Sequence, residues 1–124
     1  MANSILVADD ELELIKNMSL LLQELGYEVY TATDGETTLA CLKEKKPEVL
    51  ILDINMPRLS GEDVLRELGK LGFKTKVIIS TGYAMSDETL KERILKNFKV
   101  SAFLEKPCSI EEIDYVIKEV LKEE

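Results

Sequence analysis

The sequence predicts a doubly wound α/β fold, in which helices cover both faces of a five-stranded parallel sheet. Along the 124 residues, five short apolar runs alternate with segments whose apolar residues recur at helical spacing. The apolar runs are nearly continuous in Val, Ile and Leu, as is typical of parallel strands buried on both faces. Regular alternation of strand and helix favours one parallel sheet over segregated helical and β layers.

The first two strand–helix units occupy the N-terminal part of the chain. We expect a strand over residues 4–8, a helix over 11–25, a second strand over 28–32 and a second helix from about 35 to 45. The apolar residues of the first helix recur at helical spacing: Leu12, Ile15, Met18, Leu22 and Leu25. Gly26 follows them and suits a helix end, because glycine accepts the left-handed conformation.

The third unit contains the most apolar strand. Pro47 breaks the chain before this strand, which is expected over residues 49–53. After a loop at 58–61, a helix over 62–71 is expected to turn Val64, Leu65 and Leu68 inward. Gly72 then ends this helix.

Two further units complete the alternation. We expect a strand at 76–80, a helix capped by Ser86 or Asp87 that runs to about residue 98, a strand at 100–104, and a final helix from about residue 110. Ser109 and Glu112 form a capping-box pattern before the final helix.

The chain length and composition limit what the protein can do. A chain of 124 residues supports one domain over residues 1–124, so any output module is expected on another protein. The net charge of −8 argues against nucleic-acid binding and fits a metal cation or a basic protein surface better. Since no apolar stretch approaches about 20 residues and the N-terminus lacks a signal-peptide pattern, we expect a cytoplasmic protein that does not enter membranes.

The cysteine and histidine content excludes common zinc sites. Cys41 and Cys108 fall in different expected elements without CxxC spacing, and the chain has no histidine. We expect both cysteines to be free thiols, with Cys41 a small core residue.

Polar residues that can carry chemistry follow four of the expected strands. Asp9 and Asp10 follow the first strand, Asp53 ends the third, Thr81 follows the fourth and Lys106 follows the fifth. In doubly wound sheets, functional residues gather at the carboxyl ends of the strands. The formation and retention of an aspartyl phosphate require four kinds of group: a carboxylate, a cation site, a hydroxyl and an ammonium.

Each of these residues also has a structural interpretation when it is considered alone. Asp9 and Asp10 could start a helix whose dipole favours acidic residues. Together with Asp53 they can instead bind Mg²⁺, which prefers oxygen ligands, and the backbone carbonyl of Asn55 is a further candidate ligand. Lys106 precedes Pro107 and would otherwise be a surface charge beside a turn, with a cis peptide among its options.

Over nearly its whole length the chain resembles the receiver domain of bacterial two-component response regulators. The matching segments are ILVADDE at 5–11, LILDINMP at 50–57 with Gly61, VIISTGY at 77–83 and AFLEKP at 102–107. The resemblance implies a flavodoxin-like (βα)5 fold with strand order 2-1-3-4-5. It also implies that Asp53 accepts a phosphoryl group from a phosphohistidine of a sensor histidine kinase or a histidine phosphotransfer protein, with Mg²⁺ or Mn²⁺ present.

The resemblance assigns the remaining residues to the metal site and to a switch. Asp10 would bind the metal directly, Asp9 largely through water, and Asn55 through its carbonyl. Lys106 would pair with the phosphoryl group, while Thr81 and Phe103 would move on activation; Phe103 is equally well explained as a core aromatic. The implied output is binding of a downstream protein, with Tyr115 a candidate contact, and a homodimer that forms on phosphorylation is consistent with the family.

Three alternatives stay open. A phosphatase of the haloacid-dehalogenase type uses similar residues, but there the acidic pair follows the lysine, and a second Asp stands where this chain has Asn55. A flavodoxin-like binding module would place phosphate-cradling glycines in the first turn, which is acidic here. A receiver that signals without phosphorylation would not need the complete residue set. The segment between Thr81 and Lys106 is a few residues longer than is common in this family. Cys108 also stands where many family members carry an aromatic residue. These two departures leave the choice of partner open.

Overall fold

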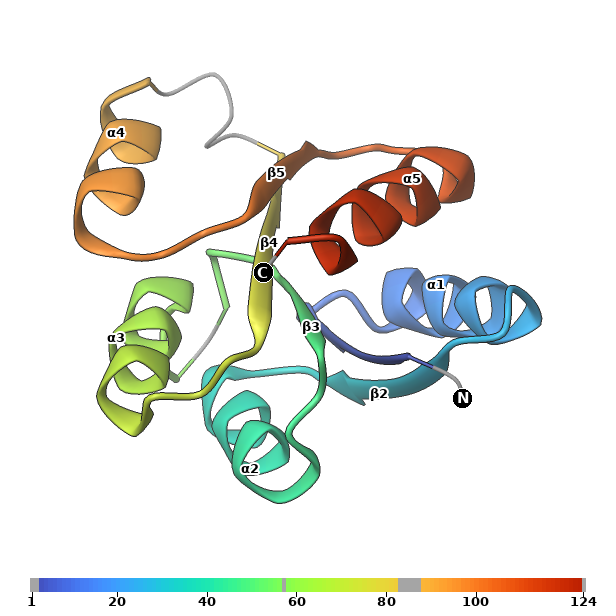
Figure 1. Cartoon of the computed structure of the whole chain (residues 1–124), viewed down its shortest axis with the longest axis horizontal. Coiled ribbons are helices and arrows are strands. Elements are labelled where there is room, and N and C mark those ends of the chain that lie inside the picture. The colour runs from blue at the N-terminus through green and yellow to red at the C-terminus, as the bar shows by residue number, and fades with distance from the viewer. Residues whose placement is uncertain (1–2, 57, 83–87, 124) are drawn as a thin grey trace.

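The computed structural model describes residues 3–56, 58–82 and 88–123, without the side chains of residues 81 and 88–90. Five parallel strands form one sheet in the order β2-β1-β3-β4-β5, which confirms the predicted order (Figure 1). The strands are β1 (Ser4–Ala8), β2 (Glu28–Ala32), β3 (Val49–Leu52), β4 (Lys76–Thr81) and β5 (Ala102–Glu105). The helices are α1 (Leu12–Glu24), α2 (Gly35–Lys45), α3 (Gly61–Leu71), α4 (Glu88–Asn97) and α5 (Ile110–Leu121).

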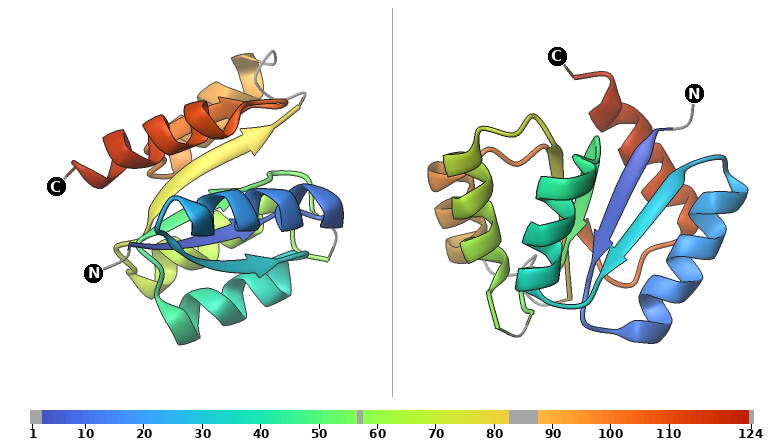
Figure 2. Two further views of the ribbon diagram at one scale, coloured as in Figure 1. Left: turned by 90° about the vertical axis from the view of Figure 1, so that its right-hand side faces the viewer. Right: turned by 90° about the horizontal axis from the view of Figure 1, so that it is seen from below.

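Helices cover both faces of the sheet, as the sequence predicts. Helices α1 and α5 lie on one face and α2, α3 and α4 on the other (Figures 1 and 2). Successive residues of a strand point to opposite faces, so Leu6 and Ala8 enter the core beneath α2, α3 and α4, whereas Ile5 and Val7 enter the core beneath α1 and α5. Each face of β1 is therefore apolar, which explains its uninterrupted hydrophobic run.

The register of the sheet sets the position of the polar residues after the strands. Ala8 of β1 pairs with Leu52 of β3. The residues that follow these two strands, Asp9 and Asp53, therefore lie side by side. The backbone N–H of Asp53 donates to the Ala8 carbonyl at 2.9 Å and fixes this arrangement. Strand β4 reaches further, and Thr81 pairs with Glu105. Lys106 follows Glu105 directly and therefore lies at the same edge of the sheet.

Several predicted apolar positions do not enter the core. Helix α1 buries Ile15, Met18 and Leu22, whereas Leu12 and Leu25 are exposed. Leu12 begins α1 and Leu25 is its C-cap, so both lie at the ends of the helix, beyond the stripe that packs on the sheet. Helical spacing therefore identifies the three central residues of the buried stripe, and the two residues at its ends lie outside the core.

Some predicted boundaries also differ from the structure. Helix α3 buries Val64, Leu65 and Leu68 as expected. In α4, Ile94 is buried and Leu95 is exposed, because Ile94 faces the core beneath α2, α3 and α4 and the next residue points about 100° away from it. Strand β4 runs one residue further than predicted and β5 begins two residues later, while the predicted caps Ser86 and Asp87 lie outside the described residues.

Capping boxes start two of the helices. Ser60 and Asp63 form one at α3, and Ser109 and Glu112 form the predicted one at α5. These side chains satisfy backbone N–H groups that the first helical turn leaves without partners.

Among the described helices, none combines the length and the apolar character that crossing a membrane requires.

Candidate functional site

Polar residues at the strand ends line a hollow at the carboxyl edge of the sheet. The hollow has a volume of about 670 Å³, and its polar lining includes Asp10, Asp53, Asn55 and Lys106. Its apolar wall comes from α1 and the segment that enters α5. This edge is the crevice in which doubly wound folds bind their ligands.

Two carboxylates that emerge side by side at this edge, those of Asp9 and Asp53, are buried. Asp9 is 4% exposed and Asp53 is 6% exposed. The Asp53 Oδ1 atom accepts a hydrogen bond from the Asn55 backbone N–H at 3.0 Å, and Asp9 Oδ1 accepts one from the Glu11 N–H at 3.0 Å. These bonds satisfy one oxygen of each carboxylate, and the other oxygen of each faces the Lys106 ammonium.

Lys106 supplies the positive charge between these carboxylates. Its Nζ atom lies 2.6 Å from Asp9 Oδ2, 3.5 Å from Asp53 Oδ2 and 3.6 Å from Glu11 Oε1. The Lys106–Pro107 peptide is cis, the option considered from the sequence. The surface-charge interpretation of Lys106 is therefore wrong, because its ammonium faces the acidic residues of the site.

The surroundings of Asp53 make its charged form costly. Burial raises the pKa of Asp53 above its usual value, and the charge of Asp9 adds to the rise, although the Asn55 N–H and Lys106 oppose it. Burial alone would lower the pKa of Lys106, but its hydrogen bond to Asp9 and the charges of Asp53, Asp9 and Glu11 outweigh burial and raise it. A second positive charge near Asp53 would therefore favour the ionised form of its side chain over the protonated form.

The acidic residues fit a divalent cation. Oxygen atoms of Asp9, Asp10 and Asp53 lie within 4.8 Å of one another. All three are hard oxygen donors, which suits Mg²⁺ better than softer metals. Asp10 is exposed and faces the hollow, so a hydrated cation can approach it from solvent. The carbonyl of Asn55 as a ligand remains a prediction.

The structure describes the two predicted switch residues, Thr81 and Phe103, to different extents. Thr81 ends β4 at the edge of the site, but its side chain lies outside the described residues. Phe103 is half-buried and packs against the core beneath α2, α3 and α4. Tyr115 is 65% exposed, so its side chain does not belong to the core.

Two residues of the site were missed in the sequence. Glu11 reaches Lys106, and Ser80 is buried and lines the hollow. The position of Glu11 directly after the acidic pair could have indicated its role. Ser80 gives a weaker signal, because it stands inside an apolar strand.

Both cysteines are free thiols as expected, but Cys41 packs against the edge of the core and is not fully buried in it. Cys41 and Cys108 are both free thiols and both half-buried. Cys108 lines the hollow, but burial raises the pKa of its thiol, and the charge of Glu112 raises it further. A raised pKa lowers the thiolate fraction on which cysteine reactivity depends.

Comparison with known proteins agrees with the fold and the acidic edge. The family model described as "Response regulator receiver domain" matches residues 5–118. The chain is 29% identical over 122 residues to the alkaline phosphatase synthesis transcriptional regulatory protein PhoP of Bacillus subtilis, covering 98% of this chain and 50% of that protein. The chain therefore spans about half the length of this curated relative.

Solved structures give the same result. A response regulator receiver domain from Clostridium thermocellum is 32% identical with a TM-score of 0.83, and the match covers 96% of this chain and 94% of that one. A CheY-like receiver domain from Methanospirillum hungatei is 26% identical with a TM-score of 0.84, covering 96% and 93%.

The fold and site define a doubly wound α/β domain with an acidic pocket at its carboxyl edge. The chain belongs to the receiver-domain family of response regulators, which act in two-component signalling. Receiver domains bind Mg²⁺ in an acidic pocket, accept phosphoryl groups from histidine kinases and are generally not turnover enzymes.

Proposed function

We propose that this domain stores a signal as a phosphoryl group on Asp53. The observation that carries the proposal is the position of the Asp53 carboxylate, which is buried between a pair of acidic residues and the ammonium of Lys106. The donor is a phosphohistidine on a sensor kinase or a phosphotransfer protein, since this chain has no histidine of its own.

The residues of the site have distinct tasks in the transfer. An Asp53 oxygen forms the new bond to phosphorus while the bond between phosphorus and the donor's ring nitrogen breaks, and the electron pair of that bond stays on the imidazole. The Lys106 ammonium lies close enough to Asp53 to contact the oxygen atoms of the transferred phosphoryl group and to offset their negative charge. The Asn55 N–H holds the carboxylate in place during the approach. A bound Mg²⁺, held by Asp9, Asp10 and Asp53, would screen the repulsion between the two anions.

We propose that the output is a change in protein binding on the face formed by α4, β5 and α5. Phe103 and Tyr115 both line a hollow of about 580 Å³ between β5 and α5. Thr81 and Phe103 carry the change from Asp53 to this face, in the way that a ligand biases one of two arrangements. A downstream protein, or a second copy of the domain, then binds the altered face.

Incubation with Mg²⁺ and acetyl phosphate, followed by intact-mass measurement, tests the acceptor. We expect one labile phosphate adduct, which is absent in Asp53→Asn and retained in the control Asp114→Asn on α5. Thr81→Ala should still take up phosphate but lose the change in partner binding or self-association. Absence of the adduct in the unaltered protein, or steady turnover of many phosphomonoesters, would contradict the proposal, and the second result would favour a phosphatase.

A further inference from the structure

Helix α4 contacts the edge strand β5 through a cation and an aromatic ring. The ammonium nitrogen of Lys91 lies 5.2 Å from the centroid of the Phe103 ring. Both side chains are half-buried, so solvent screens the contact only in part. Separations below about 6 Å allow a cation–π attraction. The contact therefore restrains the Phe103 ring from the side of α4.

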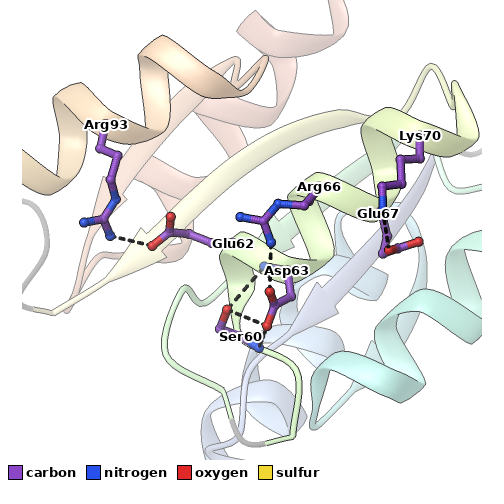
Figure 3. Close-up of polar contacts among 7 residues, drawn as sticks. All are labelled: Ser60, Glu62, Asp63, Arg66, Glu67, Lys70 and Arg93. Carbon is purple, nitrogen blue, oxygen red and sulfur yellow. Dashed lines mark hydrogen bonds and ion pairs between the residues drawn. The ribbon is translucent and has the colours of Figure 1, made fainter.

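Lys91 can act as a fixed support because α4 is itself anchored. Arg93 of α4 pairs with Glu62 of α3 at 2.5 Å, and the next residue of α3, Asp63, pairs with Arg66 (Figure 3). Ile94 lies three residues after Lys91 and is buried in the core. The ion pair and the buried side chain hold α4 while the Lys91 side chain extends to β5.

Phe103 lies between the phosphoacceptor site and the proposed binding face. It lies on β5, three residues before Lys106, which follows the strand and contacts Asp9 and Asp53. Its ring also borders the hollow that Tyr115 lines. A rearrangement that draws Lys106 toward a phosphoryl group on Asp53 would thus reach Phe103 directly through the strand.

We propose that Lys91 is a positioning residue that holds Phe103 in the arrangement in which Lys106 contacts Asp9 and Asp53. This inference rests on the proposed function of Asp53. Loss of the Lys91 cation removes a restraint from this arrangement only, so the alternative arrangement of Phe103 becomes more populated. Since linkage is reciprocal, the domain then accepts phosphate more readily.

Fluorine NMR can follow the ring itself. The chain has three phenylalanines, so uniform 4-fluorophenylalanine labelling gives three signals, and Phe103→Leu identifies the relevant one. We expect Lys91→Gln to move the Phe103 signal toward its position in the phosphorylated protein. Lys91→Arg keeps the cation and should restore the original position, and Lys96→Gln, an exposed lysine on the same helix, should leave it unchanged. An unmoved signal in Lys91→Gln, or an equal shift in Lys96→Gln, would overturn the proposal.

The rate of phosphorylation by acetyl phosphate provides the second readout. The cation–π attraction at a partly exposed site corresponds to about a two- to fivefold faster uptake in Lys91→Gln, with Lys91→Arg and Lys96→Gln near the original rate. An unchanged or slower rate in Lys91→Gln would refute the link to the switch. If the unaltered protein takes up no phosphate, the proposed function of Asp53 and this link both fail, while the fluorine signal still decides whether Lys91 positions Phe103.

Discussion

The ammonium of Lys106 is bound more closely by Asp9 than by Asp53. The Nζ atom lies 2.6 Å from Asp9 Oδ2 and 3.5 Å from Asp53 Oδ2. Asp9 therefore satisfies Lys106 while leaving the oxygen of Asp53 less tightly held. This arrangement suits a carboxylate that must attack phosphorus, because a nucleophile fully committed to an ion pair would first have to break it.

Replacement of Lys106 by Met should destabilise the domain when no divalent cation is present. The change leaves two buried carboxylates facing one another without their shared positive charge, at an expected cost of about 2 kcal/mol in the free energy of unfolding. Urea unfolding followed by circular dichroism measures the loss. Adding Mg²⁺ should reduce it, since the cation offsets the same charges.

Lys118→Met is the matched control for this experiment. Lys118 pairs with Asp114 at 2.9 Å but is exposed on α5. Exposed pairs contribute at most about 1 kcal/mol, and Mg²⁺ should not affect the result. Equal losses in the two variants, or a Lys106→Met loss that Mg²⁺ leaves unchanged, would argue against the charge arrangement described.

Asp10→Ala should weaken Mg²⁺ binding without unfolding the protein. Asp10 is exposed, so its removal should change the free energy of unfolding by no more than about 0.5 kcal/mol. Loss of one carboxylate ligand should lower the affinity at least about tenfold. Isothermal titration calorimetry with Mg²⁺, repeated with Mn²⁺, measures this.

The control for Asp10→Ala is Glu13→Ala, which removes an exposed carboxylate from the first turn of α1. Its Mg²⁺ affinity should stay close to that of the unaltered protein. A similar fall in both variants would mean that Asp10 acts only through the general negative charge of this end of the molecule.

The sequence predicted the architecture because hydrophobic periodicity reports which faces of an element are buried. It also predicted which strand ends carry Asp9, Asp53 and Lys106, since each follows a strongly apolar run. Register then brings them together through pairings such as Ala8 with Leu52, which the sequence does not state.

Other features depend on tertiary packing and had no local signal. The exposure of Leu12 depends on where α1 extends beyond the sheet, and the contact of Lys91 with Phe103 joins elements that are separate in sequence. The Lys106 ammonium also lies closer to Asp9 than to Asp53, and this small difference in distance depends on side-chain packing. Periodicity cannot predict such distances.

Tyr27→Phe should lower stability in a pH-dependent way. The Tyr27 hydroxyl donates to Asp114 Oδ1 at 2.6 Å and links the start of β2 to α5. This bond, together with Lys118, holds the pKa of Asp114 below its usual value. Burial and the same bond raise the pKa of Tyr27. We expect a loss of about 1 kcal/mol near neutral pH.

The sign follows from the two pKa directions. A lowered Asp114 pKa stabilises the folded protein above the usual value near 4, and this is lost as the pH falls through the folded-state pKa. A raised Tyr27 pKa stabilises it below about 10, and this is lost as the pH rises through the folded-state pKa. The difference between Tyr27→Phe and the unaltered protein should therefore be largest from about pH 5 to 9 and shrink on both sides. Tyr115→Phe, at an exposed site, should show no such profile.

Two glycines of α3 should respond oppositely to the same substitution. Gly61 begins α3, and a Cβ atom there would lie 2.6 Å from Ile54 Cα and 3.0 Å from the Ile54 carbonyl oxygen. The Gly61 N–H also donates to that oxygen at 2.9 Å, so this turn cannot widen without losing a hydrogen bond. Gly61→Ala should cost about 1–3 kcal/mol in the free energy of unfolding, as overpacking does.

Gly69 lies on the same helix with nothing within 4 Å of an added Cβ. Gly69→Ala should therefore stabilise the domain by about 0.5–1 kcal/mol, because alanine loses less backbone entropy in a helix. Ile54 follows Asp53, so Gly61→Ala should also slow phosphorylation by acetyl phosphate, whereas Gly69→Ala should not. If both variants gain stability, the close approach of α3 to the loop after β3 does not exist in solution, and Asp53 is positioned by its contacts with Ala8, Asn55 and Lys106 without help from α3.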